Sequence, residues 1–158
     1  MSIDVLNESG YAVDELELVA CARHVLDQMH VHPDAELCIT LADEAAMETL
    51  HVQWMDLPGP TDVMSFPMDE LRPGRVGELS AQGVLGDVVL CPSVAERQAL
   101  DAGHAPIEEL LLLTTHGILH LLGFDHAEPE DKQEMFELQR QLLLTYLAGR
   151  GRPGSIQP

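Results

Sequence analysis

The chain has 158 residues, 46% of them hydrophobic, and its 8 Lys and Arg against 27 Asp and Glu give a formal net charge of −19. This length supports one substantial core, so we expect a single domain over residues 1–148 and a disordered tail at 149–158. The acidic excess repels polyphosphate chains at long range, so we expect no DNA partner, and any RNA hypothesis must account for the repulsion.

Periodicity along the chain predicts an α+β fold with about four strands and about five helices. Alternating or continuous apolar runs predict strands at 2–7, 36–42, 62–66 and 83–91. Helical spacing predicts helices at 13–29, 45–55, 93–103, 107–123 and 128–149. The fourth helix is apolar nearly all round, so we expect it to be buried at the centre of the domain. The polar stretch 68–82 is expected to be an exposed, mobile loop.

No segment has the pattern of a membrane span or a secretory signal. The longest apolar run, Ile107 to Leu122, is shorter than the roughly 20 residues that cross a bilayer. The N-terminus lacks a basic region followed by an apolar run and a cleavage site. We therefore expect a cytoplasmic protein without a membrane partner. The three cysteines form no CxxC pair, so neither a disulfide framework nor a cysteine zinc site is predicted.

The stretch HGILHLLGFDH places three histidines in and just after the central helix. His116 and His120 are four residues apart and share one helix face. A turn at Gly123 can bring His126 back toward them. Three imidazoles leave a tetrahedral ion one open position, so we predict one catalytic Zn²⁺ held by these three side chains. The other histidines are expected to be solvated or hydrogen-bonded in the core; they are His24, His30, His32, His51 and His104.

The spacing HxxxHxxGxxH is also that of the metzincin metalloproteases. In that class the residue after the first histidine is a glutamate that serves as general base, whereas this chain has Gly117. Glycine inside a helix costs about 1 kcal/mol relative to alanine, which indicates that something approaches the backbone closely. Tight packing against a strand and room for substrate are both open explanations.

Two signatures resemble the YbeY family of bacterial single-strand-specific endoribonucleases. HGILHLLGFDH resembles HGxLHLxGYDH, with Phe124 in the place often held by Tyr, and PTDVMSFP at 60–67 resembles PTDVLSFP. LGDVVLCPSVAERQA at 85–99 is similar to the family's strand and following helix. The resemblance implies a mixed sheet packed with helices around a central one, with a metzincin-like zinc site. It also implies cleavage of single-stranded RNA, maturation of the 3′ end of small-subunit rRNA and ribosome quality control.

One position departs from the family pattern. Many members carry an arginine shortly before the PTDV signature that is thought to assist catalysis or bind phosphate. Here Met55 occupies that position, and His51 stands where an asparagine is common. A thioether cannot stabilise a phosphorane. Another cation, such as Arg72 or Arg75 from the predicted loop, must take the role, or RNA cleavage is weak.

Further residues are candidates for the chemistry. Asp125, beside the third histidine, is expected to act as general base or to support a ligand, although capping the turn explains it equally. Thr61, Asp62 and Ser65 are candidate substrate contacts, although turn and strand chemistry explains them nearly as well. Two other functions remain open. One is a metalloprotease-like hydrolase. The other is a non-catalytic ribosome assembly factor, in which the zinc is structural and the acidic face docks on basic ribosomal proteins.

Overall fold

Four strands form one mixed sheet. The computed structural model describes residues 2–125 and 127–150. The strands pair in the order β1-β2-β4-β3, with β3 antiparallel to β4 and the other neighbours parallel. They span β1 (Ser2–Asn7), β2 (Glu36–Leu41), β3 (Val63–Pro67) and β4 (Val84–Leu90). The predicted strands are thus confirmed to within one residue at each end, and β4 is interior, as its apolar run indicated.

Five helices surround the sheet, and their ends follow from local chemistry. They are α1 (Glu15–Gln28), α2 (Glu44–Met55), α3 (Pro92–Ala102), α4 (Pro106–Leu121) and α5 (Pro129–Arg150). Asp43 caps α2 by accepting a hydrogen bond from the amide of Ala46 at 2.8 Å. Gly103 ends α3 with φ at 80°. The predicted tail starts too early, because Gly149 and Arg150 continue α5. Residues 151–158 lie outside the described residues, so their disorder stays a prediction.

Helix α4 is the centre of the fold, as its composition predicted. It packs on α1, α3, α5, β3 and β4, and most of its residues are buried. The hydroxyls of Thr114 and Thr115 donate to the carbonyls of Leu110 and Leu111, so two polar side chains enter the core with their hydrogen bonds made. Among the described residues, no helix is both long and apolar enough to cross a membrane.

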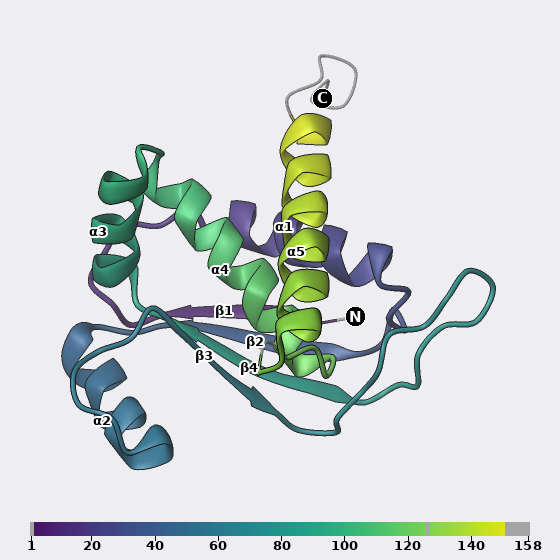
Figure 1. The fold of residues 1–158 in the computed structure, drawn as a ribbon, viewed down its shortest axis with the longest axis horizontal. Coiled ribbons are helices and arrows are strands. Elements are labelled where there is room, and N and C mark those ends of the chain that lie inside the picture. The colour runs from purple at the N-terminus through teal and green to yellow at the C-terminus, as the bar shows by residue number, and fades with distance from the viewer. Residues whose placement is uncertain (1, 126, 151–158) are drawn as a thin grey trace.

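The sheet has a thickly covered face and a sparsely covered one (Figure 1). Helices α1, α4 and α5 lie on one side, and α2 lies on the other, near β3 and β4. Met64 and Phe66 of β3 face α2, where they join a small apolar cluster with Met47. Ser65, between them in sequence, faces α4 because side chains alternate along a strand. The edge strand β3 therefore divides α2 from α4, and this division shapes the site.

Candidate functional site

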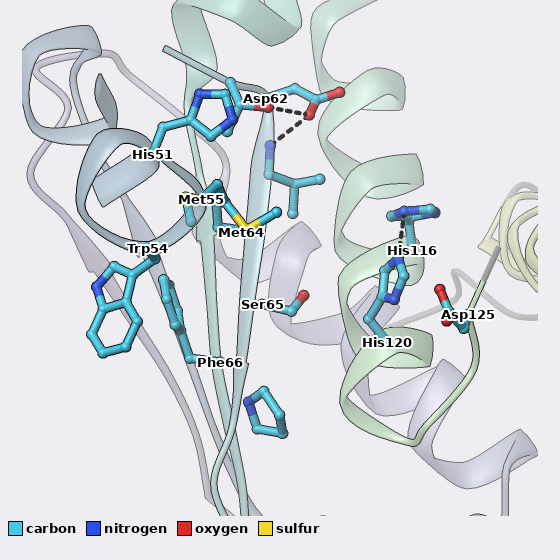
Figure 2. Close-up of a pocket in the computed structure, with 13 residues that line it drawn as sticks. His51, Trp54, Met55, Asp62, Met64, Ser65, Phe66, His116, His120 and Asp125 are labelled. Carbon is cyan, nitrogen blue, oxygen red and sulfur yellow. Dashed lines mark hydrogen bonds between the residues drawn. The ribbon is translucent and has the colours of Figure 1, made fainter. Parts of the chain in front are cut away.

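Helix α4 brings His116 and His120 together on one face. Their Nε2 atoms are 3.1 Å apart, and their ring centroids are 4.6 Å apart with the rings nearly perpendicular. Two nitrogens bound to one tetrahedral ion at about 2.0–2.1 Å lie about 3.3 Å apart. The observed separation fits that requirement without a change in the helix. Both rings open onto a cleft of about 700 Å³ beside β3 (Figure 2).

Gln139 of α5 orients the first imidazole. The Nδ1 atom of His116 lies 2.7 Å from Oε1 of Gln139, whose side chain is only 7% exposed. A carbonyl oxygen only accepts, so Nδ1 is the donor, and the neutral ring keeps its lone pair on Nε2. Phe136 stacks on the other side of this imidazole, at 5.9 Å and 23°. Sequence reasoning missed both residues, because the packing angle of α5 against α4 decides which of its side chains meet His116.

The third predicted ligand, His126, lies outside the described residues. Within the described part of the chain, no three His, Cys, Asp or Glu side chains form a group that could hold a metal. The backbone turns after α4 at Gly123, whose φ is 98°. Asp125 follows this turn and lines the cleft beside the two histidines. The turn is as the sequence predicted, and the three-histidine zinc site stays a prediction.

The three candidate substrate contacts all line the cleft, and each also has a hydrogen bond within the protein. The hydroxyl of Ser65 donates to the carbonyl of Gly117 at 3.0 Å, linking β3 to α4. Asp62 accepts from the amide of Val63 at 2.7 Å and from the hydroxyl of Thr61 at 3.3 Å. These hydrogen bonds stabilise the start of β3. This is the turn and strand role that the sequence also allowed for these residues.

Helix α4 packs closely on the sheet at Gly117. A Cβ atom at this position would lie 2.8 Å from Cγ1 of Val88, 3.1 Å from its Cγ2 and 3.2 Å from Oγ of Ser65. Contacts this short are inside van der Waals distance. The close approach that the glycine predicted is therefore packing against β4 and β3.

The opposite wall of the cleft comes from α2. His51, Trp54 and Met55 line it, and Nδ1 of His51 is 2.9 Å from the carbonyl oxygen of Gly59. Trp54 is 61% exposed and meets Phe66 edge to face, with the ring centroids 5.7 Å apart. Neither Trp54 nor His51 was predicted to be a site residue. Both flank Met55 on α2, so its place beside the PTDV signature was the signal that could have found them.

Among the described residues, the lining of the cleft carries no fixed positive charge. Neither Lys nor Arg is among the described residues that line it, whereas Asp62 and Asp125 are. Arg75 pairs with Glu78 at 3.1 Å on the surface. Arg72 packs its guanidinium over the backbone of Gly123. Neither of the two arginines that could replace the one absent at position 55 therefore lines the cleft.

A buried carboxylate, paired with a half-buried histidine, lies two helical turns before His116. Glu109 of α4 is only 7% exposed, and its Oε1 is 2.8 Å from Nε2 of His104. Burial raises the pKa of Glu109, the carboxylate of Asp62 raises it further, and His104 opposes both. His104 is thus hydrogen-bonded in the structure, as expected of it.

The comparison with protein families agrees with the two signatures. The model of the family described as endoribonuclease YbeY matches residues 4–147. The chain belongs to the YbeY endoribonuclease family. The family match spans both the α2–β3 wall and the α4 histidines, so the whole cleft lies within the YbeY region.

Curated relatives and a solved structure show the same relationship over nearly the full chain. A YbeY endoribonuclease of Beutenbergia cavernae is 69% identical over 150 residues, covering 95% of this chain and 100% of the relative. One of Kineococcus radiotolerans is 60% identical, covering 100% and 94%. A Thermotoga maritima protein solved in solution superimposes with a TM-score of 0.64 at 25% identity, covering 100% of this chain and 97% of that one. The single-domain α+β fold is therefore confirmed.

Proposed function

We propose that this chain is a zinc-dependent endoribonuclease that cleaves single-stranded RNA, with His116, His120 and His126 holding one ion. The observation that carries the proposal is the pair of Nε2 atoms 3.1 Å apart at the wall of an open cleft, in a chain of an endoribonuclease family. The substrate of the enzyme is proposed to be rRNA in the maturing small ribosomal subunit. Residues 1–148 are proposed to form the functional domain, acting in the cytoplasm.

The chain's own residues prepare the cleft for hydrolysis. Gln139 keeps the His116 lone pair on Nε2, and Phe136 fixes the ring plane. When bound, zinc supplies a Lewis acid that favours ionisation of water and polarises a phosphate oxygen. Asp125 lines the cleft beside the two histidines, which supports its proposed role as the base that accepts a proton from the attacking water. Thr61, Asp62 and Ser65 shape the wall against which the RNA lies, without a nucleophilic role.

The metalloprotease alternative meets a steric obstacle. A protease with this histidine spacing needs a glutamate at position 117 as its base. In this structure even a Cβ at that position would lie 2.8 Å from Val88, so a longer side chain has no room without moving α4. A casein assay run beside the RNA assay separates the two hydrolases, and we expect no peptide cleavage.

A non-catalytic assembly factor is the second candidate, favoured by the net charge of −19 and by the absence of Lys and Arg from the described lining of the cleft. The test is metal analysis of the purified chain, together with cleavage of a single-stranded RNA oligonucleotide with and without chelator. We expect one zinc per chain and cleavage that chelation abolishes. His116→Ala should lose both, whereas His24→Ala, which removes an imidazole paired with Thr145, should keep both. Cleavage that persists in His116→Ala would refute the proposal.

A further inference from the structure

We infer that Trp54, backed by Phe66, is a stacking platform for a nucleobase of the RNA. The chain then binds its substrate mainly through contacts to the bases rather than to the phosphates. The inference rests on the proposed function and names how that site recognises its substrate. Its starting point is the position of Trp54, the single tryptophan of the chain, on the wall of the cleft that holds His116 and His120.

The exposure of Trp54 is unusual for so large an apolar side chain. Indole rings are mostly buried in folded proteins, yet 61% of this one is exposed at the end of α2. Phe66 supports it from β3 by an edge-to-face contact at 67°, so the indole is held in place while most of its surface stays exposed. Met55, 57% exposed, extends the same apolar wall. An aromatic face held open beside a hydrolytic site is suited to a flat ligand.

The charge of the cleft decides which part of an RNA strand this wall can bind. Phosphates are normally held by Lys and Arg, and neither is among the described residues lining the cleft. Asp62 and Asp125 would repel phosphates there, and the net charge of −19 adds repulsion at long range. A nucleobase is uncharged and presents a flat π face, so stacking supplies an attraction that can offset this repulsion. A base on Trp54 accounts for how an acidic protein retains RNA.

The arrangement also explains a restriction to single strands. Figure 2 shows Trp54 and Phe66 on one side of β3 and the two histidines on the other. An RNA strand that reaches both must therefore pass across the edge of the sheet. A base can reach the indole only if it is unstacked from its neighbours and unpaired. Bases inside a duplex present no free face, so double-stranded RNA cannot use the platform.

Fluorescence of the single tryptophan reports stacking directly. The full-length protein, as purified, is titrated with a single-stranded phosphorothioate RNA that resists cleavage. A matched oligomer with the same sugar-phosphate chain but no bases serves as the comparison. We expect strong quenching by the first and little by the second. Affinity for a dye-labelled RNA should fall about 5- to 150-fold in Trp54→Ala, as for loss of one stacked base, and should be largely kept in Trp54→Phe.

Two controls make the result specific. Val52→Ala removes an exposed apolar side chain from the same helix, outside the cleft lining, and should leave the affinity unchanged. The affinity for RNA should also depend only weakly on salt concentration, because few phosphate contacts are expected. Each phosphate contact to a single strand contributes a slope of about −0.7 in a plot of log affinity against log salt. We expect a slope shallower than about −1.5.

The possible failures are distinguishable. Equal quenching and affinity for the oligomer without bases, or a steep salt slope, would overturn the platform. An unchanged affinity in Trp54→Ala, with chelator-sensitive cleavage intact, would overturn it also while leaving the proposed function standing. Base-dependent quenching in a zinc-loaded protein that cleaves no RNA would support the platform and refute the nuclease.

Discussion

Replacing Gly117 by alanine would place a methyl group between α4 and the sheet. The added carbon would lie 2.8 Å and 3.1 Å from the two γ carbons of Val88, which is fully buried and cannot turn away into solvent. These short contacts can be relieved only if α4 moves away from the sheet by a substantial fraction of an ångström. Such a shift also stretches the 3.0 Å hydrogen bond from Ser65 to the Gly117 carbonyl. Overpacking and a weakened hydrogen bond therefore arise together.

The net effect can be estimated from opposing contributions. Overpacking a core costs roughly 1–3 kcal/mol, and loss of a hydrogen bond costs about 1 kcal/mol. Replacing a helical glycine by alanine returns about 1 kcal/mol. We expect Gly117→Ala to lower the free energy of unfolding by roughly 1–3 kcal/mol and Tm by roughly 3–8 °C in a chain of this size. Calorimetry measures the change in stability, and RNA cleavage with zinc titration measures the displacement of the histidines.

The control is Gly149→Ala in α5, where an added Cβ meets nothing within 4 Å. It should leave Tm the same or slightly higher and cleavage unchanged. Val88→Ala combined with Gly117→Ala removes the clashing carbons, and its cleavage should exceed that of Gly117→Ala alone. A rise in Tm with normal cleavage for Gly117→Ala would refute the argument that this glycine is required by packing.

Three further predictions address the residues around the histidines. Gln139→Leu removes the acceptor for Nδ1 of His116, so zinc affinity measured against a chromophoric chelator should fall about 10–100-fold, whereas exposed Gln141→Leu should not change it. Met55→Arg adds a cation to the cleft wall, and RNA affinity should rise with a salt slope steeper by about 0.7; an unchanged slope would mean that position 55 does not reach phosphate. Burial raises the pKa of Glu109, so the stability that its protonated form contributes is present at low pH and lost as pH rises through the raised value. Calorimetry should show Glu109→Gln gaining Tm relative to the parent as pH increases from about 4 to about 7, and a constant difference would contradict the burial effect.

The sequence predicted local features better than contacts between elements. Strand and helix ends were found because alternation, caps and glycines act within a few residues, as at Asp43 and Gly103. The pairing of His116 with His120 follows from helix geometry alone, so it was predictable as well. Gln139 and Trp54 were missed for the opposite reason. Their positions depend on how α5 packs on α4 and on which side of β3 the helix α2 lies, and no local pattern encodes either.

The position of β3 gives these features a common cause. β3 is an edge strand, with α4 on one face of the sheet and α2 on the other (Figure 1), and side chains of both helices line the cleft beside it. Close packing at Gly117 brings α4 near enough for its histidines to face that cleft. The same packing leaves no room for a protease's glutamate, and Met55 provides no charge for phosphate. What remains along the cleft is a pair of metal-type ligands on one wall and aromatic surface on the other. That combination suits an unpaired nucleotide better than a peptide or a duplex.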